Sequence, residues 1–246
     1  MGSRRLSLRL FDGIHGEIAM KKYLSVLISA VFLLQAIPVF AKPGHPVIRS
    51  GNPDSMKIAL TFDDGPHPYK TNVILDLLSR YNIRATFFVV GENVSYYPEP
   101  LKRAVSLGHE IGNHTYHHTP LSNACEKNTA EEIEKTEEIV FHTTGYRTKL
   151  FRPPEGAYNE CALSVAQSKD YRVILWTVDT RDWELPSTDN IVANVTANVR
   201  GGSILLFHDY MSKKSHAIEA LEILIPNLLA KGYEFVTVSE LLAQDQ

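Results

Sequence analysis

The chain has 246 residues, which is enough to build one large hydrophobic core. Hydrophobic residues make up 44% of it and charged residues 22%, a globular composition that excludes a largely disordered chain. The formal net charge is −3, and no dense run of Lys and Arg follows the N-terminus. We therefore expect no nucleic-acid partner and no polyanionic substrate.

A charged segment followed by an apolar one predicts export. Two lysines at positions 21–22 precede the apolar run 23–34, and the chain then reaches Ala41, a small residue that suits signal cleavage. Residues 1–19 would make the charged region unusually long, so translation from Met20 or an added leader is an alternative.

An uncleaved membrane anchor is the other alternative, because residues 23–40 approach the length that spans a bilayer. Gln35 and Pro38 interrupt this segment, and we expect cleavage, with no stable membrane span afterwards. The expected organisation is an N-terminal extension with its signal peptide over residues 1–41, a Pro/Gly linker over 42–54 and one folded domain over 55–246.

Beyond the linker, strand-like and helix-like segments alternate. The candidate strands, in chain order, are Met56 to Phe62, Arg84 to Val90, Glu110 to Asn113, Lys149 to Arg152, Arg172 to Val178, Ser203 to Phe207 and Glu234 to Val238. Several are continuous apolar runs, as expected of parallel strands that are buried on both faces. The segments between them have helical spacing, as in residues 73–78 and 218–228. This alternation predicts a parallel α/β fold, either a barrel or an open sheet.

Local signals suggest where some helices begin, bend and end. Thr129 with Glu132 three residues later has the pattern of a capping box. Gly145 and Gly232 are suitable helix stops, and Pro226 should kink the last long helix.

The two cysteines, Cys125 and Cys161, are too few for a disulfide scaffold or a thiolate metal site. Export would place them in an oxidising compartment, and both lie near the starts of candidate helices. We therefore expect a bridge between them, with two buried free thiols as the alternative.

The first candidate strand ends on two adjacent acids, Asp63 and Asp64, followed by a Gly-Pro turn. Consecutive strand positions point to opposite faces, so one acid can bind a metal while the other acts as a base. Taken alone, the pair would favour a solvated turn.

A second motif offers metal ligands. His114 and His118 are separated by four positions, one helical turn apart on the same face, with His117 as a possible competitor. With Asp64 as a third ligand, the set would have two nitrogens, one oxygen and an open position for water, the pattern of a catalytic Zn²⁺ site.

Reactive residues follow five different candidate strands. The clusters are Asp63/Asp64, His114 with His117/His118, Arg152, Asp179/Asp182 and His208/Asp209. In parallel barrels the C-terminal strand ends share one rim, where active sites are built. We therefore expect these clusters to form one site.

With these residues in place, the chain from Lys57 to Leu242 resembles the polysaccharide deacetylase family, carbohydrate esterase family 4, which includes chitooligosaccharide and peptidoglycan N-deacetylases. Five motifs carry the resemblance: TFDDGP at 61–66, HTYHH at 114–118, RPPEG at 152–156, DTRDW at 179–183 and LFHD at 206–209. Each motif alone would be weak, but together they are highly specific.

The resemblance implies a distorted (β/α)7 barrel that forms the catalytic domain. It implies that Asp64, His114 and His118 hold a divalent metal, which we expect to be Zn²⁺, with Co²⁺ or a similar ion as the alternative. It also implies a set of roles: Asp63 as catalytic base, Arg152 orienting Asp63, His208 as general acid, Asp182 tuning His208, and Trp183 with Leu206 lining the pocket for the acetyl methyl group.

Three of these roles have a simpler structural alternative. Arg152 could only pair with a surface acid, Trp183 could only fill the core, and His208 could be a satisfied buried histidine. We assign no catalytic role to His117, Asp179 or Asp209.

One departure from the family concerns Glu155, where the family usually has Tyr or another aromatic residue. The resemblance assigns the backbone N–H at this position to the oxyanion, so a changed side chain need not remove the donor. A carboxylate in the cleft would instead alter which substrates bind.

The expected function is that of an exported metal-dependent N-deacetylase acting on an N-acetylated glycan such as chitooligosaccharide or peptidoglycan. A first alternative is an O-acetyl esterase on xylan or a hydrolase of small amides. A second is an inactive glycan-binding protein on the same barrel. The motifs leave the oligomeric state open.

Overall fold

The structure is a computed structural model that describes residues 47–210 and 214–243. The expected signal peptide and the first part of the expected linker lie outside the described residues. Within the described part of the chain, the helices are all too short or too polar to span a bilayer.

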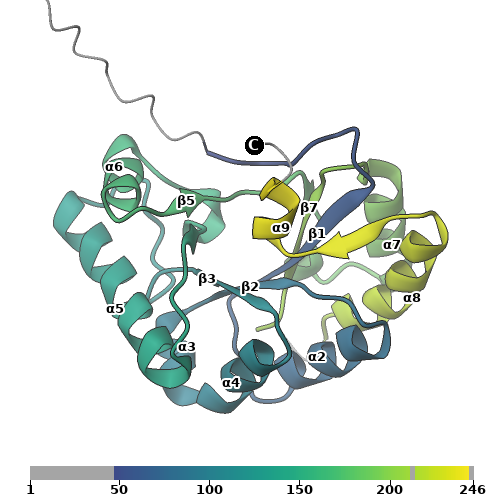
Figure 1. Cartoon of the computed structure of the whole chain (residues 1–246), viewed down its shortest axis with the longest axis horizontal. Coiled ribbons are helices and arrows are strands. Elements are labelled where there is room, and N and C mark those ends of the chain that lie inside the picture. Colours follow the sequence, from purple (N-terminus) through teal and green to yellow (C-terminus); the bar gives the residue numbers. More distant parts are fainter. Residues whose placement is uncertain (1–46, 211–213, 244–246) are drawn as a thin grey trace, which may run out of the picture. The chain divides into compact units, whose positions relative to one another are not determined.

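The described strands form one parallel sheet, and helices surround it on the outside (Figure 1). Its strands are β1 (Lys57–Asp63), β2 (Thr86–Val89), β3 (Glu110–Asn113), β4 (Leu150–Phe151), β5 (Arg172–Val173), β6 (Val178–Asp179), β7 (Ile204–His208) and β8 (Glu234–Val236). Hydrogen-bonded neighbours follow the order β5-β4-β3-β2-β1-β7-β6, and β8 pairs with β1.

The predicted strand from Arg172 to Val178 is divided into β5 and β6. Its first part pairs with β4 and its last part pairs with β7, so the chain between them connects the two ends of the sheet. If β5 and β6 count as one strand, six strands follow this path, and β8, which pairs with β1 beside it, makes seven strands in the sheet. The distorted (β/α)7 barrel is thereby confirmed, and the open-sheet alternative is wrong.

Alternation along β1 separates a structural face from a chemical one. Ile58, Leu60 and Phe62 belong to the large apolar cluster that includes residues of α2 and α8. Phe62 stacks on Phe87, with the ring centroids 5.0 Å apart. Ala59 instead belongs to a second, inner cluster. Asp63, two positions beyond Thr61, therefore ends the face that points into the barrel.

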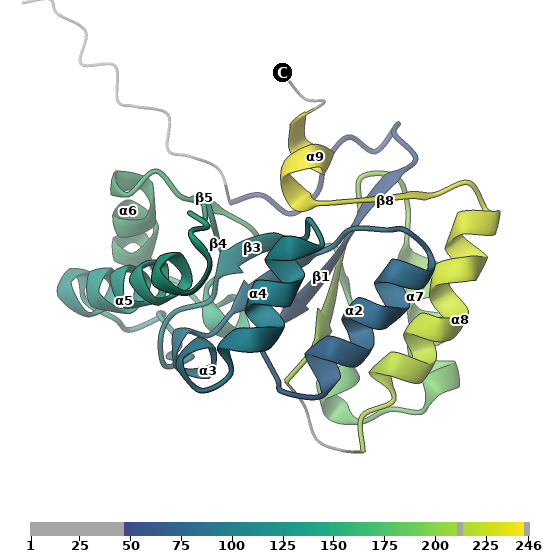
Figure 2. The same ribbon diagram turned by 60° about the horizontal axis from the view of Figure 1, so that its bottom comes forward.

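The helices follow one another around the outside of the sheet, as the turned view shows (Figure 2). They are α2 (Lys70–Arg80), α3 (Gly91–Tyr96), α4 (Pro98–Ser106), α5 (Glu126–Thr144), α6 (Glu160–Ser168), α7 (Thr188–Asn198), α8 (Ala217–Ala230) and α9 (Val238–Leu242), with short 3-10 turns η1 (Pro154–Gly156) and η2 (Asp182–Glu184). Pro226 lies inside α8. Gly145 ends α5 with φ 72°, as predicted.

Residues 47–52 of the expected linker belong to the fold. Ile48 forms a parallel bridge with Ile174, and Ser50 forms an antiparallel bridge with Ser203. The Gly51 N–H donates to the Gly202 carbonyl over 2.8 Å. Residues 47–52 therefore lie against the chain just after β5 and just before β7.

Two local predictions are wrong. Helix α5 begins at Glu126, so Thr129 lies inside it and its hydroxyl donates to the Cys125 carbonyl instead of capping the helix. The expected bridge between the cysteines is the second wrong prediction, because both are free thiols. Cys125, the N-cap of α5, is exposed, and Cys161, in the first turn of α6, is half-buried. Each begins a different helix, and neither is fully buried.

Candidate active site

The five clusters of reactive residues meet at the C-terminal rim of the barrel, as predicted. They surround a cavity of about 410 Å³. Eight residues predicted to belong to the site line this cavity: Asp63, Asp64, His114, His118, Glu155, Trp183, Leu206 and His208. Trp176 and Asp179 line it as well. Arg152 and Asp182 are fully buried and contact lining residues from behind.

Asp63 and Asp64 both face this cavity, so the expectation that they point to opposite faces is wrong. Asp63 is the last residue of β1, whereas Asp64 has φ 75° and leaves the strand direction. The left-handed turn brings the second carboxylate to the same side as the first. Asp209 lies behind this turn, because a Cβ added at Gly65 would fall 2.2 Å from the Asp209 Oδ1 atom.

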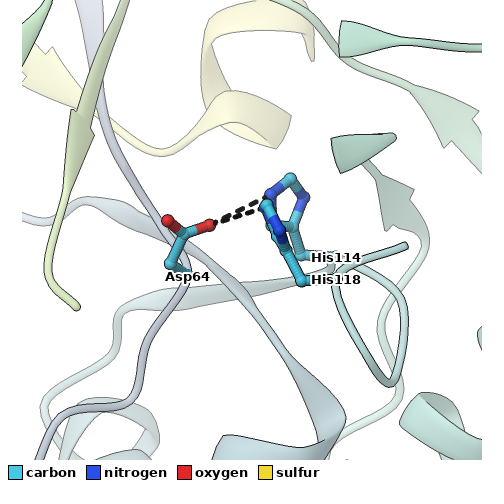
Figure 3. A group of neighbouring side chains, drawn as sticks. All are labelled: Asp64, His114 and His118. Atoms are coloured by element: carbon cyan, nitrogen blue, oxygen red, sulfur yellow. Dashed lines mark ion pairs between the residues drawn. The ribbon is translucent and has the colours of Figure 1, made fainter. Parts of the chain in front are cut away.

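Asp64, His114 and His118 form a compact group of three potential ligands (Figure 3). One donor atom from each lies within 4.8 Å of the others. The Asp64 Oδ1 atom is 3.4 Å from the His114 Nε2 atom and 3.1 Å from the His118 Nε2 atom. Among the described residues this buried oxygen has no hydrogen-bond partner.

A hydrogen bond on the far side of the ring orients His114. Its Nδ1 atom lies 2.7 Å from the Arg152 carbonyl oxygen, which can only accept, so the proton is on Nδ1 and the Nε2 lone pair faces Asp64. Burial raises the pKa of Asp64, but the two imidazoles outweigh burial and lower it well below its ordinary value. Two nitrogen donors, an anionic oxygen and an orphaned acceptor fit a divalent cation such as Zn²⁺.

Arg152 extends from the end of β4 into the barrel interior and is completely buried. Its Nη1 atom donates to the Asp63 Oδ1 atom over 2.6 Å and to the Thr61 hydroxyl over 2.9 Å. Its guanidinium lies over the Phe88 ring, 4.0 Å from the centroid. Asp63 is only 3% exposed, so this bond fixes the orientation of a buried carboxylate.

His208 and Asp182 form a second buried pair. The His208 Nδ1 atom lies 2.7 Å from the Asp182 Oδ1 atom, and the His208 backbone N–H donates to the Asp182 Oδ2 atom over 2.9 Å. The remaining ring nitrogen, Nε2, is therefore the atom free to act in the cavity. Burial by itself lowers the pKa of His208, but the bond to Asp182 and the charges of Asp182, Asp63 and Asp64 outweigh it and raise the pKa to about 9.

The segment that carries the two candidate histidine ligands is not a helix, so the expected helical spacing is wrong. Thr115 has φ 65° and His118 has φ 56°, and this irregular turn brings the two rings to a centroid distance of 5.1 Å. His117 instead pairs with Glu132 of α5, its Nδ1 atom 2.7 Å from the Glu132 Oε1 atom. His117 is thus not in the ligand group.

Trp183, Leu206 and Glu155 line the cavity, as predicted. Trp183 is 54% exposed, so it does not fill the core, whereas Leu206 is buried. Glu155 is exposed and has φ 57° within η1. Trp176, which lies between β5 and β6, is a lining residue that the motifs did not identify. The only signal for it was its position near the end of a predicted strand.

Asp209 is buried directly behind the site. Its Oδ2 atom accepts a hydrogen bond from the Thr71 hydroxyl over 2.5 Å, and its backbone N–H donates to the Asp63 carbonyl. Burial, together with the charges of Asp64 and Asp63, raises the pKa of Asp209 to about 7. It contacts the turn that carries Asp64, but it does not line the cavity.

A parallel barrel whose rim holds a restrained carboxylate, an opposing imidazolium and three convergent metal-type ligands defines a class: hydrolases that cleave amide or ester bonds. The model of one such family, described as polysaccharide deacetylase, matches residues 50–174. The chain belongs to this family and is a hydrolase of it.

Comparison with known proteins supports this membership. A peptidoglycan-N-acetylglucosamine deacetylase of Bacillus cereus is 42% identical over 190 residues, which is 77% of this chain and 69% of the relative. A crystal structure of a peptidoglycan N-acetylglucosamine deacetylase in complex with a benzamide derivative is 40% identical, with a TM-score of 0.77, over 80% of this chain and 92% of that one.

A family 4 acetyl xylan esterase from Clostridium thermocellum, crystallised in complex with a cobalt ion, has the same fold. It is 34% identical, with a TM-score of 0.70, over 75% of this chain and 89% of that one. Proteins similar to this chain therefore include hydrolases named for peptidoglycan and for xylan.

Proposed function

We propose that the protein is an exported, divalent-metal-dependent N-deacetylase that removes acetyl groups from an N-acetylated glycan of the peptidoglycan or chitooligosaccharide type. One observation carries the proposal: Asp63 and His208 border the cavity that holds the Asp64, His114 and His118 ligand group. Each is oriented by a buried residue of opposite charge. A binding protein would have no need of this arrangement.

Asp64, His114 and His118 would hold the ion. When bound, a divalent ion polarises the acetyl carbonyl and makes water easier to deprotonate. His114 contributes Nε2 because its Nδ1 proton is committed to the Arg152 carbonyl. The cobalt complex of the xylan esterase and the donor set of this chain both support this assignment.

Asp63 would take a proton from the attacking water. Its Oδ1 atom is engaged by Arg152, and its Oδ2 atom lies 3.7 Å from the His114 Nε2 atom, so Oδ2 faces the ligand group. As water attacks, the acetyl carbon becomes tetrahedral and its oxygen becomes negative. We assign the Glu155 backbone N–H to this oxyanion, and Trp183 with Leu206 to the acetyl methyl group.

His208 would protonate the leaving nitrogen through Nε2. Amines are poor leaving groups, so the C–N bond breaks only when a proton is delivered to nitrogen. A His208 pKa of about 9 keeps the ring protonated at neutral pH. The products are acetate and a free amino sugar.

Export would bring the enzyme to a cell-wall or extracellular glycan. Lys21, Lys22 and the apolar run after them support a signal peptide that ends at Ala41, ahead of the domain proposed for residues 55–246. N-terminal sequencing of the exported protein checks this proposal, which predicts a mature chain beginning at Lys42.

O-deacetylation of xylan is the second candidate, favoured by the similarity to the acetyl xylan esterase. An ester oxygen leaves more readily than an amine, so an esterase depends less on a strongly held general acid. The buried Asp182 behind His208 therefore favours N-deacetylation. Hydrolysis of a small amide would use the same groups and differs only in its substrate.

A substrate panel tests the proposal. Acetate release is measured from peptidoglycan, N-acetylchitooligosaccharides, acetylated xylan and a small acetamide, each with and without chelator. We expect chelator-sensitive release from an N-acetylated glycan to exceed release from acetylated xylan. The reverse ranking would support the esterase, and no turnover with added Zn²⁺ or Co²⁺ would support the inactive binding protein.

A further inference from the structure

The turn that carries the histidine ligands is anchored from outside the barrel by one side chain of α5. Glu132 projects from the second turn of this helix, and its side chain is only 14% exposed. Its Oε2 atom accepts hydrogen bonds from the backbone N–H groups of Tyr116, over 3.0 Å, and His117, over 2.9 Å. Its Oε1 atom pairs with the His117 ring.

This anchor matters because the turn has no regular structure of its own. Thr115 and His118 both have left-handed φ angles, which non-glycine residues keep only where the surroundings hold them. Helix α3 binds the outer side, with the Gly91 and Glu92 N–H groups donating to the Thr115 and Tyr116 carbonyls. The α3 bonds hold carbonyl groups of the turn, whereas Glu132 holds the N–H groups of Tyr116 and His117.

The two ligand histidines do not depend equally on this anchor. His114 follows β3 directly, its N–H donates to the Val89 carbonyl, and its ring is fixed by the Arg152 carbonyl. His118 comes directly after the two N–H groups that Glu132 binds, and its side chain is 37% exposed. A change at Glu132 should therefore displace His118 more than His114.

The simpler interpretation is a surface ion pair between Glu132 and His117. Such pairs contribute little, and the His117 side chain is 48% exposed. The two backbone bonds, however, do not require the His117 ring, because any residue other than proline at positions 116 and 117 would donate them. The two interpretations therefore predict different effects of changing the glutamate and the histidine.

We propose that Glu132 is a positioning residue that holds His118 in place for the metal through the backbone of Tyr116 and His117. This inference rests on the proposed metal site. Partners that orient metal ligands from behind typically change metal affinity by about 10- to 100-fold when removed. We expect a loss of that size in Glu132→Ala, and a smaller one in Glu132→Gln, whose amide oxygen can still accept from both N–H groups.

The test measures the dissociation constants of Zn²⁺ and Co²⁺ by chelator competition on the purified full-length protein, together with the visible spectrum of the Co²⁺ form. Glu131→Ala is the matched control, since Glu131 is the adjacent exposed acid. Its Oε1 atom lies 3.9 Å from the Lys127 Nζ atom. His117→Gln removes the ring pair alone. We expect Glu131→Ala and His117→Gln to remain within about threefold of wild type, while Glu132→Ala binds about 10- to 100-fold more weakly with an altered Co²⁺ spectrum.

Two results would overturn the proposal: wild-type affinity in Glu132→Ala, or an equal loss in His117→Gln and Glu132→Ala. If metal-free Glu132→Ala has a lower melting temperature than the metal-free wild type, Glu132→Asp replaces it. Aspartate keeps the charge, but its side chain is too short to reach both backbone N–H groups. Glu132→Asp should also bind metal weakly, and normal binding there would overturn the proposal. A wild-type protein that binds no metal would instead contradict the proposed function.

Discussion

The active-site residues fall into two groups that are held in different ways. Asp63 and His208 are strand residues, and they lie side by side as register partners in the parallel ladder between β1 and β7. Asp64, His118 and Glu155 lie on turns and all have positive φ angles. The ladder fixes the first group, whereas contacts from elsewhere must hold the second.

In the proposed mechanism, the strand residues transfer protons, whereas the turn residues bind the metal and the substrate. Left-handed backbone in non-glycine residues costs about 1–3 kcal/mol each, so those turns depend on their surroundings. The strand-borne groups have partners of their own, Arg152 for Asp63 and Asp182 for His208. We therefore expect changes on the strands to abolish chemistry, and changes on the turns to alter affinity and specificity.

The largest effect is expected on the strands. Asp63→Asn should retain metal but lose about 10²- to 10⁴-fold in turnover, because the amide cannot accept the proton from water. Acetate release and elemental analysis of the same preparation measure both quantities. A melting temperature close to wild type is the control, since Arg152 loses a charged partner. Near-normal turnover would remove Asp63 from the mechanism.

The second effect concerns the acid and its pH dependence. In the proposed mechanism His208 acts in its protonated form, so activity should fall as pH rises through its pKa of about 9. Burial lowers this pKa, and Asp182 is the main group that raises it. Asp182→Asn should therefore move the alkaline limb of the kcat profile down by about one unit or more.

Asp179→Asn is the control for this shift, because Asp179 also lines the cavity but has no bond to the His208 ring among the described contacts. Its alkaline limb should stay where it is in the wild type. If Asp182→Asn leaves the limb in place as well, another group is the acid.

A smaller effect is expected at Glu155, on a turn. Glu155→Gly suits a φ of 57° and keeps the backbone N–H, so turnover of a small N-acetylated substrate should stay within about tenfold of wild type. Loss of an oxyanion donor would cost about 10²- to 10³-fold. Proline, with φ fixed at about −65°, cannot adopt this turn, so Glu155→Pro does not test the role of the backbone N–H.

Steady-state kinetics of Glu155→Gly and Glu155→Gln distinguish the backbone from the carboxylate. If both variants lose more than about a hundredfold with metal content and melting unchanged, the carboxylate itself takes part in chemistry or binding. In that case the side chain at this turn belongs with the catalytic group.

The smallest effect is expected outside both groups, at the start of α5. Cys125 is the N-cap residue and makes no side-chain capping bond. Cys125→Ser would supply an acceptor and should stabilise the protein by roughly 0.5 kcal/mol, as measured by urea unfolding. A disulfide would reverse the sign, with a loss of about 2–4 kcal/mol, and thiol titration of denatured, unreduced protein would then find no free sulfhydryls.

The same division explains what the sequence could predict. The apolar runs of β1 and β7 end at Asp63 and His208, so these rim positions were predictable from periodicity and motifs. The division of the 172–178 segment was not, because it depends on which neighbours each half meets when the ring closes.

Turn geometry was also beyond the sequence patterns. Adjacent acids at 63–64 and a four-residue histidine spacing are compatible with a strand and a helix, yet the chain uses left-handed turns at Asp64 and His118. Glu132 matched a capping pattern, but it binds backbone from a turn more than a dozen residues earlier. Such long-range contacts leave no local signal.

The central claim is that Asp64, His114 and His118 hold the ion required for N-deacetylation. The most direct test strips metal from the full-length protein and follows acetate release from an N-acetylglucosamine oligomer as Zn²⁺ or Co²⁺ is added back. The account predicts no release without metal and full release at about one ion per chain, with no recovery at that stoichiometry in His118→Ala. Undiminished release from the stripped protein, or full recovery in His118→Ala, would contradict it.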